Sequence, residues 1–129
     1  MMKKLVAAFI VLSLMTVLIA ACGGSSTGSG GSGSGNDVHM NDSNFVLSTV
    51  TISKGSSLNL IDDTSTVHII QNGTWNNNTP SLKKESGAPI VNQTFTGNDT
   101  HAIGPFNTAG TYDIFCTVHP GMNLTVIVK

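Results

Sequence analysis

Two runs of alternating apolar and polar residues, separated by a very short connection, lie within residues 111–128, and this feature constrains the fold most. Alternation with a period of two is typical of a half-buried β-strand. The connection, Thr117 to Gly121, is so short that the two strands are expected to be antiparallel neighbours. Their apolar faces contain Tyr112, Ile114 and Cys116 in the first run, and Met122, Leu124, Val126 and Val128 in the second.

Similar patterns recur upstream, and no helical stripe stands out after residue 36. Strands are predicted within residues 45–52, 57–61, 66–71, 93–96 and 101–106. Turns are predicted at Asn72-Gly73 and Gly97-Asn98, and residues 74–92 are predicted to form a long irregular loop. Seven to eight short strands with this punctuation predict an all-β fold, an antiparallel β-sandwich.

The N-terminal region predicts export and attachment to a membrane. Lys3 and Lys4 precede an apolar run, as in a signal peptide over residues 1–21. The run ends in small residues before Cys22, which resembles a bacterial lipobox whose cysteine carries a lipid. A plain signal peptide or a short membrane anchor is the alternative. Residues 22–36 predict a flexible Gly/Ser linker, and residues 37–129 predict a single extracytoplasmic domain, on the periplasmic or outer face.

The charge and the cysteine content of residues 37–129 exclude some functions. The domain has four lysines and seven carboxylates, a net charge of −3, and no arginine, so it lacks the basic patch of a nucleic-acid-binding protein. With Cys22 assigned to the lipid, Cys116 is alone and no disulfide can form within the domain. A lone cysteine in an exported domain can pair between molecules, react, be buried and inert, or bind a metal.

The spacing Cys116-x-x-His119-x-x-Met122 predicts a metal site. A type 1 copper centre needs two imidazoles, one thiolate and a weak axial thioether. His68 is the preferred second imidazole, because a histidine in the apolar run "TVHII" needs a partner for each ring nitrogen. His39 and His101 are less favoured as ligands. His39 is expected to lie on the surface, and His101 is expected to be a solvated loop residue. Each candidate ligand alone also fits a purely structural role.

These residues resemble those of the cupredoxins, the small blue copper proteins that include plastocyanin, amicyanin and auracyanin. The resemblance is carried by His68, by "GTYDIFC" (residues 110–116) and by "CTVHPGM" (residues 116–122), whose spacing is similar to the amicyanin loop. It implies a Greek-key β-sandwich holding one copper ion. His68, Cys116 and His119 would be equatorial ligands and Met122 the axial ligand.

The sequence departs from the resemblance in two places. Many cupredoxins have an asparagine directly after the first histidine, where it helps to tie the ligand loops together, but this chain has Ile69. Residues 74–92 match no feature of the family. Trp75, in that segment, is expected to pack over the sandwich rather than to lie near the site.

The expected function is a membrane-tethered one-electron carrier cycling between Cu(I) and Cu(II). The monomer would dock briefly on a membrane redox complex or a cytochrome through the small uncharged surface of His119, Pro120 and Gly121. Catalysis by this chain is not expected, because the additional His-rich motifs of copper enzymes are absent. Copper storage or delivery, and a metal-free adhesion domain, are the alternatives.

Overall fold

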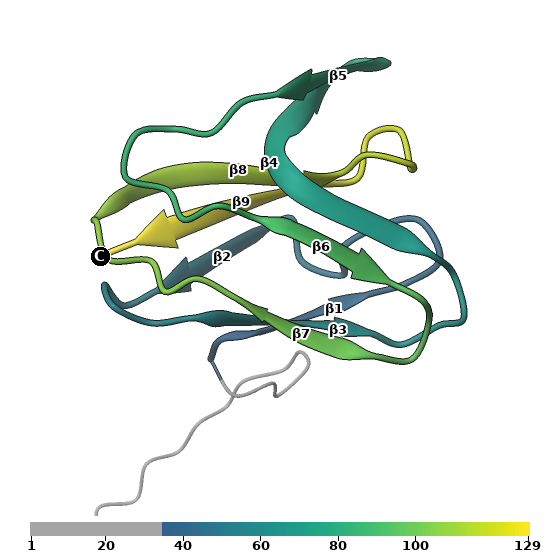
Figure 1. Ribbon diagram of the computed structural model, residues 1–129, viewed down its shortest axis with the longest axis horizontal. Helices are drawn as coiled ribbons and strands as arrows, with labels where there is room; N and C mark the ends of the chain where they lie inside the picture. The colour runs from purple at the N-terminus through teal and green to yellow at the C-terminus, as the bar shows by residue number, and fades with distance from the viewer. Residues whose placement is uncertain (1–34) are drawn as a thin grey trace, which may run out of the picture.

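The computed structural model describes residues 35–129, shown in colour in Figure 1. The predicted signal peptide, the lipidated Cys22 and nearly all of the Gly/Ser linker lie outside the described residues, and they stay predictions. Within residues 35–129 there is no helix long and apolar enough to cross a membrane.

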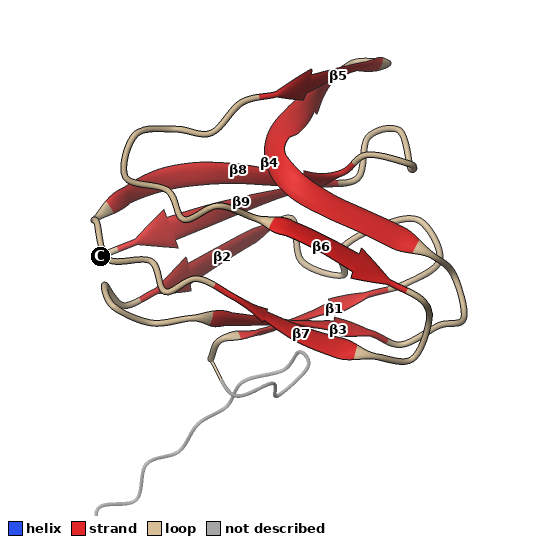
Figure 2. Ribbon diagram, viewed as in Figure 1, coloured by secondary structure: helices blue, strands red, loops and turns tan. Residues whose placement is uncertain are grey.

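The described residues form nine β-strands and no helix, which confirms the all-β prediction (Figure 2). The number of strands exceeds the predicted seven to eight, in part because residues 37–40, directly after the linker, form a strand. The strands are β1 (Asp37–Met40), β2 (Thr49–Ile52), β3 (Leu58–Asp62), β4 (His68–Asn76), β5 (Thr79–Leu82), β6 (Asn92–Phe95), β7 (Thr100–Ile103), β8 (Gly110–Cys116) and β9 (Asn123–Val128).

The strands form two sheets that face each other as a β-sandwich (Figure 1). The smaller sheet has the order β1-β3-β7, and the larger has the order β2-β9-β8-β4-β5, with β6 also paired to β4. Strand β1 runs parallel to β3 and β2 runs parallel to β9, whereas β3–β7 and β8–β9 are antiparallel. Strands distant in sequence therefore pair, as a Greek-key arrangement requires.

The core fills the space between the sheets, and the predicted strand phases place its residues. On β9 buried and half-buried residues alternate from Asn123 to Val128. On β8 the predicted inward face is confirmed, since Tyr112, Ile114 and Cys116 are all buried. Met122, directly before β9, is also buried, in phase with the inward face of that strand. The alternation thus directs the thiol and the thioether into the same core.

Two local predictions are wrong around Gly73. Asn72-Gly73 is not a turn but lies within β4, which bends strongly there (Figure 1). Gly73 has φ = 135°, and a Cβ atom on it would lie 2.1 Å from the Ser81 carbonyl oxygen. The glycine therefore permits close packing of β5 against β4 rather than a chain reversal.

The predicted irregular loop over residues 74–92 is also wrong in its first part. Trp75 pairs with Pro80 and Asn76 with Thr79, so the end of β4 and β5 form a hairpin. Asn77, at the tip, has φ = 54°, a left-handed conformation that asparagine tolerates well. Upstream, only Thr49–Ile52 of the predicted strand over residues 45–52 is a strand.

Candidate metal centre

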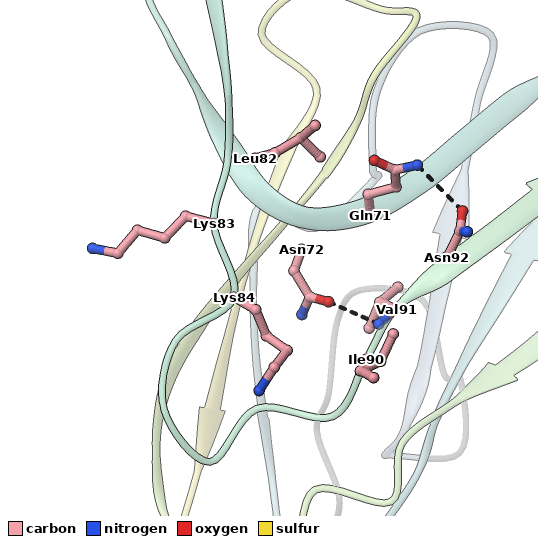
Figure 3. Close-up of a pocket in the computed structure, with 8 residues that line it drawn as sticks. All are labelled: Gln71, Asn72, Leu82, Lys83, Lys84, Ile90, Val91 and Asn92. Carbon is pink, nitrogen blue, oxygen red and sulfur yellow. Dashed lines mark hydrogen bonds between the residues drawn. The ribbon is translucent and has the colours of Figure 1, made fainter.

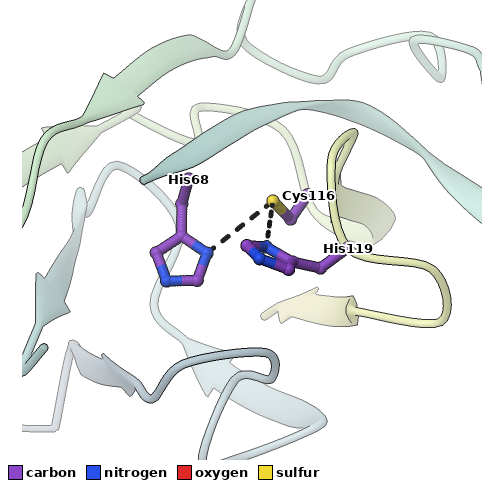
Figure 4. A group of neighbouring side chains, drawn as sticks. All are labelled: His68, Cys116 and His119. Atoms are coloured by element: carbon purple, nitrogen blue, oxygen red, sulfur yellow. Dashed lines mark hydrogen bonds between the residues drawn. The ribbon is translucent and has the colours of Figure 1, made fainter. Parts of the chain in front are cut away.

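Three predicted ligands meet at one end of the sandwich, although they come from different parts of the chain (Figure 4). His68 begins β4, Cys116 ends β8, and His119 lies in the connection to β9. The Cys116 Sγ atom is 3.3 Å from His119 Nδ1 and 3.7 Å from His68 Nδ1. The candidate ligand atoms of the three side chains all lie within 4.8 Å of one another.

The three donor atoms fit a single metal ion. Metal–sulfur and metal–nitrogen bonds of about 2.3 Å and about 2.0 Å, as known for zinc, put sulfur and nitrogen about 3.7 Å apart at a trigonal angle. The two distances from Cys116 Sγ lie at and slightly below that value. A thiolate with two imidazoles is the equatorial donor set of a type 1 copper site. The residues therefore fit one copper ion.

Met122 is the last residue of the connection between β8 and β9, which contains His119. Its backbone amide donates to the His119 carbonyl at 3.1 Å, and the Cys116 amide donates to the Met122 carbonyl at 3.0 Å. These bonds bring residues 116 and 122 together across a tight turn. The Met122 side chain is fully buried, as an axial ligand facing the core would be. Its role as the axial ligand stays a prediction.

Asp62 is a buried neighbour of His68 that the sequence analysis did not identify. Its Oδ1 atom lies 3.9 Å from His68 Nε2, and both side chains have no exposed surface. The same oxygen accepts hydrogen bonds from the backbone amide and the hydroxyl of Thr64. The signal in the sequence was its phase, because Asp62 shares the buried face of β3 with Leu58 and Leu60.

This carboxylate affects which nitrogen of His68 can bind a metal. A negative group beside Nε2 favours the tautomer with its proton there, which leaves the Nδ1 lone pair facing Cys116. Burial lowers the pKa of His68, and the charge of Asp62 opposes that shift in part. The imidazole is therefore held neutral at physiological pH, as a metal ligand must be.

The two less favoured histidines lie outside this cluster. His39 Nδ1 lies 2.7 Å from Asp63 Oδ2, and both side chains are about half exposed, as expected for a surface residue. His101 lies on β7 rather than in a loop, with its Nε2 atom 3.2 Å from Asp99 Oδ2 and its ring edge-on to Phe95. Neither belongs to the group of candidate ligands.

Trp75 both packs over the sandwich and reaches the site. Its ring meets Phe115 edge-on, with ring centroids 6.0 Å apart, so the predicted packing is confirmed. Its indole Nε1–H also donates to the Cys116 carbonyl at 2.7 Å. The expectation that Trp75 does not lie near the site is therefore wrong. The bend of β4 brings it there, and no local pattern reveals that bend.

A separate hollow of about 480 Å³ lies beside the β4–β5 hairpin (Figure 3). Lys83 and Lys84 line it together with the exposed side chains of Leu82 and Ile90. The Lys84 amine donates to the Ala88 carbonyl at 3.0 Å, so that charge stabilises the loop. The hollow lacks the soft donor atoms of a copper site.

Comparisons with solved structures agree with this geometry. The chain is similar to amicyanin from Paracoccus versutus (Thiobacillus versutus), with a TM-score of 0.55 and 25% identity over 72% of this chain and 79% of that chain. It is also similar to a purple cupredoxin from Nitrosopumilus maritimus, with a TM-score of 0.56 and 18% identity over 72% and 98% of the two chains. No protein-family model and no curated protein matches the chain.

The fold and the cluster of ligands are those of a cupredoxin. The sandwich is the fold of blue copper electron carriers, a class of carriers rather than enzymes. Its site of His68, Cys116, His119 and Met122 fits one copper ion.

Proposed function

We propose that this protein is a membrane-tethered, type 1 copper protein that carries one electron at a time between redox partners. One observation carries the proposal: a fully buried thiol lies between the Nδ1 atoms of two imidazoles, at 3.3 and 3.7 Å. The bound copper would supply the one-electron Cu(I)/Cu(II) couple. The chain would hold the donor atoms in one arrangement for both oxidation states.

The protein contributes rigidity and the exclusion of water. Cys116, His68 and Met122 have no exposed surface, so solvent does not reach the donors from their side. Ligands fixed by two strands and a tight turn rearrange little when the charge on the metal changes. Burial of the thiol also distinguishes a carrier from a delivery protein, which needs accessible ligands to exchange its metal.

The electron would leave through His119, the ligand of the cluster that reaches the surface. His119 is half-buried, whereas the residues on either side of it, Val118 and Pro120, are exposed. Val67, next to His68, is also half exposed. The exposed residues directly flanking His119 are thus apolar and uncharged, which suits a small, short-lived contact with a membrane redox complex or a cytochrome.

The copper proposal is tested by the visible spectrum of the chain after addition of Cu(II). A strong thiolate-to-copper charge-transfer band is expected, and Cys116→Ser should abolish it while leaving the fold intact by circular dichroism. Reversible voltammetry of the same sample separates a carrier from a storage protein. A wild-type chain without the band would contradict the type 1 copper site and favour a metal-free domain.

We also propose that a lipid on Cys22 tethers the domain to the extracytoplasmic side of a membrane. The small residues before Cys22 and the Gly/Ser linker after it support this. A bacterial host fed a clickable palmitate analogue should label the wild-type chain in the membrane fraction. Cys22→Ser should remain unlabelled, and equal labelling of both chains would rule out this anchor.

A further inference from the structure

Three hydrogen bonds connect the bent half of β4 to both ends of the ligand loop, defined here as Thr117–Met122. The indole Nε1–H of Trp75 donates to the carbonyl of Cys116, at the end of β8, at 2.7 Å. The Trp75 backbone N–H donates to Asn123 Oδ1, at the start of β9, at 2.8 Å. The Asn123 side-chain amide donates back to the Trp75 carbonyl at 3.2 Å.

These bonds replace a sheet ladder that has already ended. Strand β4 pairs with β8 only over Ile70, Gln71 and Asn72, and at Gly73 it turns away to pair with β5. Residue 75 of a straight β4 would lie well away from the end of β8. Strand β4 bends instead (Figure 1). Trp75 thereby lies edge-on against the fully buried ring of Phe115 on β8.

The other end of β4 carries the ligand His68, so one strand contacts the site twice. Ile69, directly after that ligand, accepts a hydrogen bond from the Thr117 amide at 2.8 Å through its backbone. Its side chain is apolar and cannot donate to or accept from the ligand loop. Side-chain support for the loop ends therefore comes from Trp75 and Asn123.

We propose that Trp75 and Asn123 form a clamp that fixes the ligand loop and thereby orients the Cys116 thiol toward the two imidazoles. A bond to the Cys116 carbonyl restrains the peptide unit that leads from this residue into the loop. The paired bonds at Asn123 hold the other end at a fixed distance. Both residues are positioning residues, and their effect on copper rests on the proposed function.

The clamp is tested first without metal, by amide hydrogen exchange of Thr117 and Met122 in the whole chain. Trp75→Phe keeps an aromatic ring against Phe115 but loses the indole donor. Asn123→Ala removes the two hydrogen bonds between the Asn123 side chain and the Trp75 backbone. This variant provides the test if Trp75→Phe does not fold. Exchange should quicken about three- to tenfold, the factor that corresponds to one neutral hydrogen bond.

Val128→Ala is the matched control, because it weakens the core at the far end of β9, opposite Gly110. It should leave local opening of the ligand loop unchanged. The double variant Trp75→Phe/Asn123→Ala should show an effect different from the sum of the single effects, since the bonds act as a unit. The clamp would be overturned if the amides of Thr117 and Met122 exchanged at the wild-type rate in both clamp variants. It would also be overturned if Val128→Ala accelerated their exchange equally.

A second readout uses copper and separates the two proposals. After loading with Cu(II), loss of copper to a chelator should be about three- to tenfold faster in the clamp variants than in the wild type. A wild type with the visible band, and variants that lose copper at the wild-type rate, would refute the clamp and leave the copper site standing. A wild type without the band, but with faster amide exchange in the variants, would refute the copper function and leave the loop clamp.

Discussion

At the residue scale, the fully buried pair of Asp62 and His68 determines how the first imidazole is presented. The histidine lies in an apolar strand, and only a nearby acceptor makes its second nitrogen acceptable there. Asp62 Oδ2 and His68 Nε2 have no hydrogen-bond partner among the described residues, and Asp62 Oδ1, which accepts from Thr64, lies 3.9 Å from His68 Nε2. The carboxylate therefore acts on the imidazole electrostatically rather than through a hydrogen bond. Asp62 occupies the place that a carboxylate takes beside a metal-bound histidine in many sites, at a distance longer than a hydrogen bond.

Asp62→Asn should therefore weaken copper binding about 10–100-fold, the usual effect of losing a partner of a metal-bound histidine. The change keeps the shape of the side chain and removes its charge. Competition with a chelator of known affinity measures the effect. Asp63→Asn is the control, because that neighbouring carboxylate is half exposed and faces His39 instead. Equal copper affinities for the two variants would contradict the role of Asp62.

A second prediction at this scale concerns Asp99 and pH. Burial acts to raise the pKa of its carboxyl, but hydrogen bonds from the Thr96 amide, His101 and the Gly97 amide outweigh burial and lower the pKa below 3.8. A lowered pKa in the folded state stabilises the protein above the pKa of the unfolded state, and this stabilisation is lost as pH falls through the folded value.

Asp99→Asn should accordingly lower the free energy of unfolding by about 1 kcal/mol at pH 7, the value of hydrogen bonds to a charged group that is partly exposed. The difference from the wild type should shrink as the pH falls below the unfolded pKa, and it should be lost below the folded pKa. Urea unfolding of the metal-free chain between pH 7 and pH 3 measures it. A difference that is constant across this range would mean that the charge contributes nothing.

At the element scale, β4 connects the two halves of the site because it bends. Its first half pairs with β6 and β8, and its second half pairs with β5 and lies over Phe115. The bend depends on Gly73, whose missing side chain leaves room for the Ser81 carbonyl and the Phe115 ring. A side chain there would separate the hairpin from the sheet.

Gly73→Ala should destabilise the chain by about 3 kcal/mol or more, because it adds a backbone clash to the strain of a positive φ. Gly55→Ala is the matched control, since Gly55 also has a positive φ, 89°, but nothing lies within 4 Å of its added Cβ. That change should cost about 1–2 kcal/mol. Urea unfolding compares the two, and equal losses would show that packing at Gly73 is unimportant.

At the scale of the whole molecule, the sandwich places the metal ligands at one end and presents His119 there. The net charge of residues 37–129 is −3, but the ligand loop has no acidic or basic residue apart from His119. The loop itself therefore adds no fixed charge to a contact between two copies of the copper-loaded protein. Rapid electron self-exchange between oxidised and reduced protein is the expected consequence.

Val118→Lys should slow this self-exchange about two- to threefold at low salt, because two copies would then meet with like charges about 7–10 Å apart. The effect should disappear in 1 M salt. Leu82→Lys is the control, since Leu82 is more exposed, 69% against 47%, but lies on β5. Line broadening by NMR measures the rate. A slower rate in the control than in Val118→Lys would place the contact surface elsewhere.

The sequence by itself determined the strands β8 and β9, the inward direction of Cys116 and Met122, and the spacing that brings His119 between them. These features follow from alternation with a period of two and from a connection too short to allow another arrangement. The choice of His68 also followed from the sequence, because an imidazole inside an apolar strand requires a partner.

Only the tertiary structure decided which distant residues support that site. Asp62 lies beside His68 because of the fold as a whole, and Trp75 reaches Cys116 because β4 bends at Gly73. The sequence suggested a turn at Asn72-Gly73, since the same dipeptide serves hairpins and close strand contacts. Local patterns set the face on which a side chain lies, whereas sheet order and bending set the neighbour it meets.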